Sequence, residues 1–300
     1  MIKSFIQLIE TAKKKSGMVT GVPSPHDNNS AKTIVSAYKE GISDFILAGD
    51  VRKIKVLLES NGGNFKDFKI VEAGSDEEAA SKIVELANSG DVKVILKGFL
   101  PTSKLMKPIL DKEKGLRTGN LLSDIMITEN PIKDKENIIG LSDGGLVILP
   151  DIMQKKHIIE NSVDVFHNLG YKNPNVGIMA AVESVKDSMP ATTDAKLLME
   201  MNVNGEIKGC SVYGPLALDI AVSREAAEHK NIDHPVAGNV DIFIMPNIES
   251  GNLLGKSFTY YLKQTVAHVV MGAKIPVLIP SRNESDIDKL HSIALGVIIA

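Results

Sequence analysis

The chain has 300 residues, of which 43% are hydrophobic and 24% charged, and its formal net charge is −3. This length favours one large α/β unit or two medium domains with a sizeable core. The charge gives no general attraction for nucleic acid or for an anionic membrane, and aromatic residues, at 4% without Trp, provide no stacking platform for single strands. We therefore expect no nucleic-acid partner and no membrane partner.

A single cysteine, Cys210, excludes an internal disulfide framework and a multi-cysteine zinc site, and it fits a reducing compartment. Near the start of the chain, Ile2, Phe5, Ile6 and Ile9 recur at helical spacing, and lysines follow them instead of preceding them as in a signal peptide. No apolar run approaches the ~18 residues that cross a bilayer. We expect a cytoplasmic protein.

In chain order, short apolar runs alternate with amphipathic segments. The first residues predict a helix, and an apolar stripe predicts another over 76–87. The runs that we expect to be strands, several of them rich in Ile, Val and Leu, are 45–48, 68–72, 92–96, 146–149, 176–181, 242–245 and 277–279. This alternation predicts an α/β fold with a mostly parallel sheet, right-handed crossovers and ligand sites beyond the carboxyl ends of the strands.

Two regions depart from the alternation. Residues 130–149 contain β-rich stretches around a turn of Pro, Lys and Asp, which predicts a hairpin or a crossing between domains. At the end of the chain, Ser285 and Asp288 form an S-x-x-D capping pattern, which predicts a final helix with an apolar stripe of Leu290, Ile293, Ala294, Val297 and Ile298.

The first candidate site is Ser281-Arg282, directly after the strand expected over 277–279. A strand end before a helix start presents backbone N–H groups, and an arginine adds a bidentate phosphate donor. The alternative is a surface arginine on a loop. For Asp288, spacing alone favours a helix cap over a catalytic role.

The second candidate is the polar turn that follows the strand over 242–245. It ends in Gly-Lys-Ser, but Gly251 and Gly255 enclose three residues where a nucleotide-binding P-loop encloses four, so we reject an ATPase. A turn of this composition that opens a helix suits a phosphate, and the alternative is a helix cap without a ligand. Its candidate binding residues are Asn247, Ser250, Gly251, Asn252 and Lys256.

The third candidate is the basic stretch over 97–117, which holds six basic and two acidic residues, a local charge of +4. An acidic protein that uses polyanionic substrates needs such a reversal, although a solvated helix face is the usual reason for such a run. Lys97, after a strand, and Arg117, after Gly115, are the strongest candidates. The seven histidines are scattered and form no metal motif, and no G-x-G-x-x-G follows a strand. Cys210 has no basic neighbour, and we expect it to be a small core residue.

Read together, these segments resemble the phosphate acetyl/butyryltransferase family, and its butyryl branch most closely. The resemblance covers most of the chain after about residue 40. The motifs together are specific for this family, although no single motif would be. The matching stretches are FILAGD (45–50), ILKGFLPTSKLMKPILDKEKGLRTGNLLSD (95–124), LSDGGLVILPD (141–151), VGIMAAVESVKDSMPATTDAKLLMEM (176–201), GEIKGCSVYGPLALDIAVSREAAEHKNI (205–232), VAGNVDIFIMPNIESGNLLGKS (236–257) and PVLIPSRNESDIDKLHSIALG (276–296).

The resemblance implies a two-domain fold like that of isocitrate and isopropylmalate dehydrogenases, with the active site in the cleft between the domains. The first domain would comprise 1–129 and 275–300, and the second 130–274. It implies reversible acyl transfer between coenzyme A and inorganic phosphate, giving an acyl phosphate. Coenzyme A is a substrate, no cofactor is tightly bound, the chemistry needs no metal, and the chain forms a homodimer or a larger homo-oligomer.

The resemblance also implies roles for single residues. The family's Ser-Arg pair falls on Ser281 and Arg282, and an aspartate that acts as base in the acetyl branch falls on Asp288, with Glu284 and Asp286 as competitors. Two residues depart from the pattern and bear on the acyl chain, namely Pro101, where relatives often carry His, and Tyr213, where Asp is common. Butyryl is preferred over acetyl on this pattern. Outside this class, the alternatives are a metal- and NAD-dependent dehydrogenase and a non-catalytic acyl-coenzyme A-binding protein.

Overall fold

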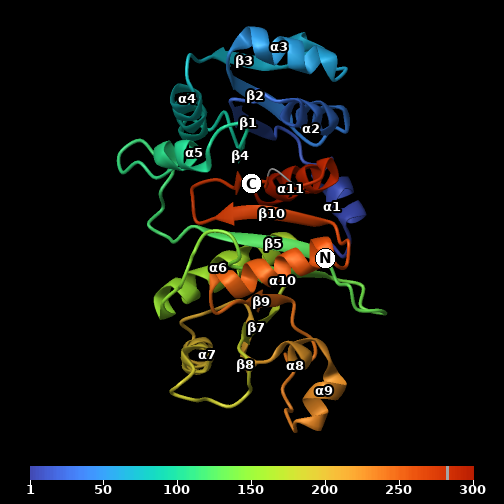
Figure 1. Ribbon diagram of the computed structural model, residues 1–300, viewed down its shortest axis with the longest axis vertical. Coiled ribbons are helices and arrows are strands. Elements are labelled where there is room, and N and C mark those ends of the chain that lie inside the picture. Colours follow the sequence, from blue (N-terminus) through green and yellow to red (C-terminus); the bar gives the residue numbers. More distant parts are fainter. Residues whose placement is uncertain (282–283) are drawn as a thin grey trace. The chain divides into compact units, whose positions relative to one another are not determined.

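The computed structural model describes residues 1–281 and 284–300. Within it the chain forms two compact units, each with strands and flanking helices (Figure 1). The terminal unit comprises Phe5–Asn120 and Val266–Ala300, and the central unit comprises Met1–Ser4 and Leu121–Thr265. The sequence predicts slightly different domain limits, namely 1–129 with 275–300 for the first domain and 130–274 for the second. These limits stay a prediction.

The terminal unit is built on a sheet whose strands follow the order β3-β2-β1-β4-β11-β10. All neighbours in this order are parallel except β10 and β11, which are antiparallel. Val94, Ile95, Val277 and Leu278, at the centre of the sheet, are completely buried, as expected for strands covered on both faces. The strands are β1 (Val19–Pro23), β2 (Asp44–Gly49), β3 (Lys69–Glu72), β4 (Val94–Leu96), β10 (Val266–Met271) and β11 (Val277–Leu278).

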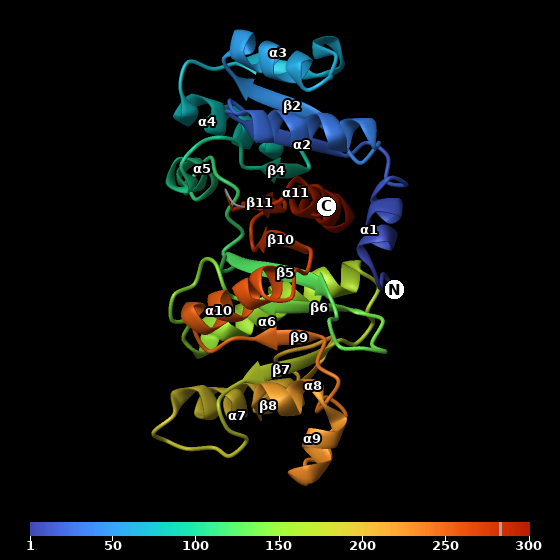
Figure 2. The ribbon, with the colours of Figure 1, turned by 45° about the vertical axis from the view of Figure 1, so that its right-hand side comes forward.

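Helices cover both faces of this sheet, with α2 and α11 on one side and α4 and α5 on the other (Figures 1 and 2). Polar side chains start several of them: Asp27 accepts the N–H of Ser30 at the start of α2, and Ser75 accepts that of Glu78 at the start of α4. The helices of the unit are α1 (Phe5–Ala12), α2 (Asn28–Lys39), α3 (Val51–Ser60), α4 (Asp76–Asn88), α5 (Thr102–Ile109) and α11 (Asp286–Ile299), with a 3₁₀ turn, η1 (Phe65–Asp67).

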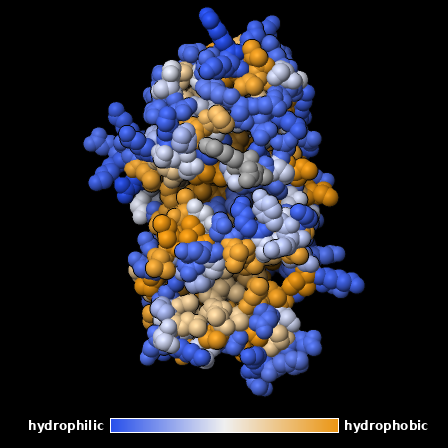
Figure 3. Space-filling view, in the orientation of Figure 1, coloured by the Kyte–Doolittle hydropathy of each residue, from blue (hydrophilic) through white to orange (hydrophobic). Residues whose placement is uncertain are grey.

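Helix α11 returns the end of the chain to the sheet of the terminal unit, where it contacts β4, β10 and β11. Gly296 permits this packing, because a Cβ atom there would lie 2.9 Å from Val94 Cγ1. The helix buries a face of eight residues, whereas α3 buries only Ile54 and Leu58. Figure 3 accordingly shows mostly hydrophilic side chains over α3.

The central unit is built on strands in the order β5-β6-β9-β7-β8, with both antiparallel and parallel neighbours. Its first two strands form an antiparallel hairpin, and the other neighbours are parallel. The strands are β5 (Ser123–Glu129), β6 (Ile138–Ser142), β7 (Asn175–Met179), β8 (Ser211–Leu216) and β9 (Ile242–Ile244). The helices are α6 (Ile152–Asn168), α7 (Pro190–Val203), α8 (Leu218–Val222), α9 (Arg224–His229) and α10 (Ile248–Tyr260).

The α/β fold with a mostly parallel sheet is confirmed, as are the first helix, the helix over 76–87 and the final helix. Six of the seven expected strands form, with ends shifted by one or two residues. A hairpin forms around the turn of Pro, Lys and Asp, but its strands span 123–129 and 138–142, so that it starts before the expected region 130–149. Among the described residues, no helix combines the length and the apolar character that spanning a membrane requires.

The strand expected over 146–149 is wrong. The N–H groups of Gly145 and Leu146 donate to Asp143 Oδ1, which holds the chain in a bend, and Ile148 and Leu149 are 69% and 74% exposed. Three strands were not expected from the sequence, β1, β8 and β10. The first two carry Gly and Pro within short segments, and both residues weaken a strand signal.

Candidate active site

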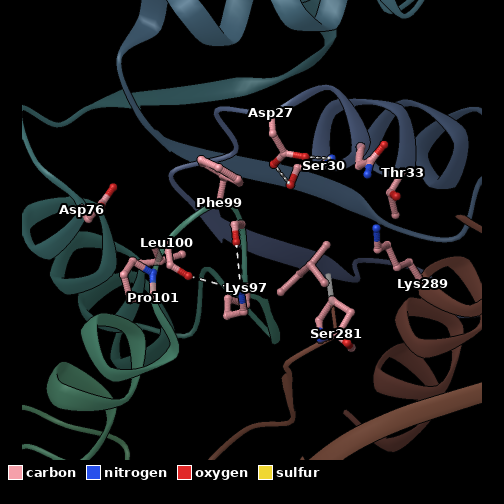
Figure 4. A pocket seen from close by; sticks show the side chains of 14 residues that line it. Asp27, Ser30, Thr33, Asp76, Lys97, Phe99, Leu100, Pro101, Ser281 and Lys289 are labelled. Atoms are coloured by element: carbon pink, nitrogen blue, oxygen red, sulfur yellow. Dashed lines mark hydrogen bonds between the residues drawn. The ribbon is translucent and has the colours of Figure 1, made fainter. Parts of the chain in front are cut away.

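A cavity of about 380 Å³ lies in the terminal unit beyond the carboxyl ends of β1, β4 and β11 (Figure 4). The chain passes from β1 to β2 and β3 on one side and then returns to β4 on the other side of β1, so the direction of winding reverses there. Open α/β sheets bind ligands at such a switch point. The cavity is lined by Asp27, Asn29, Ser30, Thr33, Asp76, Leu96, Lys97, Gly98, Phe99, Leu100, Pro101, Pro280, Ser281 and Lys289.

Lys97 follows β4 directly and is half-buried in the cavity wall. Its N–H donates to Leu278 O at 2.9 Å, which continues the pairing of β4 with β11, and its Nζ donates to Leu100 O at 3.2 Å. The next residue must be glycine for the loop to lie here, because a Cβ atom on Gly98 would stand 2.2 Å from Pro23 O. The ammonium is thus held on a rigid strand end.

Ser281 lies at the end of β11 and is exposed towards the cavity. Its N–H donates to Glu284 Oε1 at 2.7 Å. The structure therefore brings together two of the candidate residues, Ser281 and Lys97, from segments far apart in the sequence (Figure 4). Arg282, the partner of Ser281 in the candidate pair, lies outside the described residues.

Asp288 forms a capping box with Ser285 at the start of α11, as the S-x-x-D pattern predicts. Its Oδ2 accepts from Ser285 N at 3.1 Å and from Ser285 Oγ at 2.6 Å, and its Oδ1 accepts from Val266 N at 2.9 Å. Asp286 pairs with Lys32 of α2 at 2.5 Å. Asp288 and Asp286 are not among the residues that line the cavity.

The basic residues over 97–117 lie at different places in the terminal unit. Lys97 lines the cavity, whereas Lys104 pairs with Asp76 at 3.2 Å and with Glu77 at 3.1 Å. Arg117 is exposed and makes an isolated antiparallel bridge with Ala273 in the same unit. Arg117 therefore lies at a different place in the unit from the cavity lining.

Residues 247–252, expected as a turn, form the N-cap and the first residues of α10 in the central unit. Asn247 Oδ1 accepts from Ser250 N at 3.0 Å and from Ser250 Oγ at 2.8 Å, and Asn252 Nδ2 donates to Gly144 O at 3.2 Å. Gly251 lies against the 143–144 backbone, where a Cβ atom would stand 2.3 Å from Asp143 O. Lys256, one turn further along α10, is exposed.

Asp143 supports this turn from the loop after β6. It is 2% exposed, and its carboxylate accepts from the N–H groups of Asp124, Gly145 and Leu146 at 2.7–2.9 Å. Burial, and next the charge of Asp124, raise the pKa of Asp143 to about 6 despite these three donors. The carboxyl group thus fixes the loop on which Gly251 rests.

Sequence reasoning missed the contribution of α2 and α11 to the cavity. Thr33 lies one turn into α2, and Lys289 lies on the apolar face of α11, four residues before Ile293. Lys289 is 8% exposed and Thr33 is 2% exposed. A lysine within an apolar stripe was the available signal, because a charged residue on a buried face needs a partner or a ligand.

Cys210 is buried, as expected for a core residue, and burial raises the pKa of its thiol to about 12. Such a thiol is unreactive at neutral pH. In the described part of the chain, no group of three or more His, Cys, Asp or Glu side chains is arranged to hold a metal ion.

Known proteins show the same architecture and related sequences. The chain is 39% identical over 300 residues to phosphate butyryltransferase of Clostridium acetobutylicum, covering 100% of this chain and 99% of the relative. It is 37% identical over 294 residues to phosphate acetyltransferase of Thermotoga maritima, covering 98% and 99%.

Among solved structures, a branched-chain phosphotransacylase from Enterococcus faecalis aligns with a TM-score of 0.82 at 28% identity, covering 94% of this chain and 99% of that one. A 4-hydroxythreonine-4-phosphate dehydrogenase from Burkholderia phymatum aligns with a TM-score of 0.55 at 15% identity, covering 94% and 98%, and shares the fold. The dehydrogenase-like fold expected from the sequence is thereby confirmed.

The profile of the Phosphate acetyl/butaryl transferase family matches residues 78–297, most of the chain, including the candidate residues from Lys97 to Asp288. Both relatives match over nearly their whole length. The chain belongs to the phosphate acetyl/butyryl transferase family and is an acyltransferase.

Proposed function

We propose that the chain is a phosphate butyryltransferase that reversibly transfers a short acyl group, butyryl by preference, between coenzyme A and inorganic phosphate. The observation that carries the proposal is the cavity at the switch point, where Lys97 and Ser281 meet in a chain of this family. The name of the Clostridium acetobutylicum relative supports the butyryl preference. The Thermotoga maritima relative supports a second candidate, phosphate acetyltransferase.

The proposed reaction is a direct attack in a ternary complex of enzyme, acyl donor and acceptor. In one direction the thiol of coenzyme A loses its proton to a carboxylate, its sulfur bonds to the acyl carbon of the acyl phosphate, and the bond from that carbon to the phosphate oxygen breaks. A thiol of pKa ~8.5 is only a few per cent ionised at neutral pH, so a base contributes about 10²–10⁴-fold. In the other direction, phosphate attacks the thioester.

Each candidate residue has a role in this proposal. Ser281 donates a hydrogen bond to the developing oxyanion or to a phosphate oxygen, and Arg282 neutralises the leaving phosphate. Asp288 is the first choice of base, with Glu284 and Asp286 as alternatives. Lys97 and Arg117 bind phosphate groups, and the substrate floor is formed by Asn247, Ser250, Gly251, Asn252 and Lys256.

The compartment, the subunit number and the partners of the enzyme are also proposals. We infer a cytoplasmic homodimer or larger homo-oligomer that meets acyl-coenzyme A, coenzyme A, phosphate and acyl phosphate as its only partners. No tightly bound cofactor is required by the proposed chemistry. Light scattering after gel filtration measures the subunit number, and a monomeric mass would contradict the oligomer.

A thiol-release assay tests the proposed function. The protein is mixed with phosphate and with acetyl-, propionyl-, butyryl-, valeryl- or isobutyryl-coenzyme A, and free thiol is followed with time. We expect release that depends on phosphate, with the highest kcat/KM for butyryl-coenzyme A. A maximum for the acetyl ester would favour the acetyltransferase.

Two outcomes would overturn the transferase. Tight acyl-coenzyme A binding without thiol release from any ester would favour a binding protein. Hydride transfer to NAD that requires Mg²⁺ would favour a dehydrogenase on the same fold.

A further inference from the structure

Lys289 is a largely buried lysine whose ammonium opens to the cavity and has no partner among the described residues. It is 8% exposed, lines the cavity, and forms no side-chain hydrogen bond or ion pair within residues 1–281 and 284–300. An ammonium removed from water without a compensating anion is unfavourable, so such groups are paired or bind ligands. In Figure 4 its nitrogen points into the space between α11 and α2.

Thr33 supplies a second polar atom of the same kind. It is 2% exposed, and its Oγ1 has no hydrogen-bond partner among the described residues. Thr33 lies on α2 and faces Lys289 of α11 across the cavity wall (Figure 4). Two polar side chains from two helices therefore lie together, the ammonium at the cavity and the hydroxyl buried in its wall.

The charged residues that line the cavity are two lysines, Lys97 and Lys289, and two aspartates, Asp27 and Asp76. Asp27 lies at the start of α2 and accepts from Ser30, at 3.1 Å from the N–H and 2.5 Å from the hydroxyl. Asp76, on the far wall, is paired with Lys104. Lys97 stands opposite Lys289, with Ser281 between them in Figure 4. Neither aspartate pairs with Lys289, so its ammonium is left to bind an anion.

We propose that Lys289 and Thr33 bind a phosphate group in this cavity, so that Lys289 is a phosphate-binding residue. The inference rests on the proposed function, which offers two sources of that group, inorganic or acyl phosphate and the nucleotide phosphates of coenzyme A. An ammonium in the wall does not suit a butyryl chain, because the charge would lose its remaining hydration without gaining a partner.

Three variants separate this role from a structural one. Lys289→Met keeps the length of the side chain and removes its charge, Lys289→Arg restores the charge, and Thr33→Val removes only the hydroxyl. Lys39→Met is the matched control, because Lys39 is exposed at the far end of α2 and does not line the cavity. Each protein is melted with and without phosphate or coenzyme A, and the KM values for phosphate and butyryl-coenzyme A are measured.

We expect phosphate to raise the melting temperature of the wild type, and Lys289→Met to lose most of this shift. The variant's KM for phosphate should rise about 10–100-fold, as for the loss of one charge-assisted hydrogen-bonding group. Lys289→Arg should recover part of the affinity, and Thr33→Val should cost less than Lys289→Met. Without phosphate, Lys289→Met should melt close to the wild-type temperature, because the ammonium that it removes pairs with no described group.

The KM values identify which molecule supplies the phosphate group that binds here. If the KM for butyryl-coenzyme A rises instead, while that for butyryl-pantetheine, which lacks the nucleotide phosphates, does not, the bound group is a phosphate of coenzyme A.

Unchanged KM values and unchanged ligand-dependent melting in Lys289→Met would overturn the inference. So would a lower melting temperature of that variant without ligand and no change in either KM. If the wild type releases no thiol but its phosphate-dependent melting still requires Lys289, the proposed function fails while the phosphate site stands.

Discussion

Asp288 combines a capping role with a candidate catalytic role, and the two can be separated by experiment. Its carboxylate receives three hydrogen bonds, two from Ser285 and one from Val266. These bonds stabilise the first turn of α11. A base in the proposed reaction must give up part of this arrangement to accept a proton.

For Asp288→Asn we expect kcat to fall about 10²–10⁴-fold, because the amide cannot take the proton from the thiol. Stability should fall by about 1 kcal/mol from the weakened cap. Steady-state kinetics and thermal melting are measured on the same samples. Ser285→Ala is the matched control, since it damages the same cap and keeps the carboxylate. Similar activity in the two variants would leave Asp288 as a cap and point to Glu284 or Asp286.

Asp143 makes the stability of the central unit depend on pH. Its pKa in the folded protein, about 6, lies above the ordinary value of 3.8, chiefly because the group is buried. The folded state therefore holds the proton more strongly than the unfolded state. This contribution to stability is complete below about pH 4 and is lost as the pH rises through about 6.

Asp143→Asn should remove that dependence. Between about pH 4 and pH 7, the free energy of unfolding of the variant should improve relative to the wild type by about 2–3 kcal/mol, from a shift of about two pKa units. Urea denaturation at several pH values measures both proteins. The comparison isolates Asp143, since all other titrating groups are shared. A difference between the two proteins that stays constant with pH would show that Asp143 is not the group responsible.

At the scale of elements, close backbone approaches decide where the candidate loops lie. Helix α10 rests on the 143–144 loop through Gly251, and the loop after β4 rests on the loop after β1 through Gly98. A Cβ atom at either glycine would collide with the neighbouring backbone, so both contacts require glycine. The polar turn over 247–252 is therefore placed by packing as well as by its cap.

Gly251→Ala tests this contact. In a free helix the change would stabilise by about 1 kcal/mol. Here it should instead destabilise by about 1–3 kcal/mol, because the new Cβ atom would meet Asp143 O and something must shift. Chemical denaturation measures the change. Gly74→Ala serves as the control, since its Cβ atom would meet only the end of the Glu78 side chain at 3.5 Å. Equal effects of the two substitutions would argue against the close approach.

At the scale of the whole molecule, the end of the chain completes the unit that starts at Phe5. Helix α11 packs on α1, α2 and the sheet, the ring of Phe5 stacks on His291 at 4.3 Å, and Lys15 Nζ donates to Ile298 O at 2.7 Å. The terminal unit therefore depends on contacts between residues separated by most of the sequence. Loss of either end should affect the same core.

Deletion of residues 285–300 should abolish the cooperative unfolding of the terminal unit. The deleted helix buries Ile293, Leu295, Val297 and Ile298, each contributing about 1.5–3 kcal/mol, a sum comparable with the whole stability of a domain. Circular dichroism melting and binding of an apolar dye measure the effect. Deletion of the exposed Ala300 alone is the control. A truncated protein that melts as sharply as the full chain would contradict the role assigned to α11.

Much of the fold could be predicted because local signals agreed with the final packing. The apolar runs that became β4, β9 and β11 are buried on both faces, and the cap at Ser285 formed as its pattern predicts. The strand expected over 146–149 does not form, because apolar residues alone do not reveal that Asp143 accepts hydrogen bonds from two backbone N–H groups. The cleft between domains, the base and the subunit number stay predictions.

The sequence by itself determined the fold class, the family and most of the candidate residues, because strand runs, caps and family motifs are written in contiguous segments. Only the tertiary structure decided which of those residues meet. Strands β1, β4 and β11 are neighbours in one sheet, so Lys97 and Ser281 share a cavity while Arg117 does not line it. Packing of α11 on α2 alone placed Lys289 beside Thr33, because burial and distance between remote segments arise from the folded chain and from no local pattern.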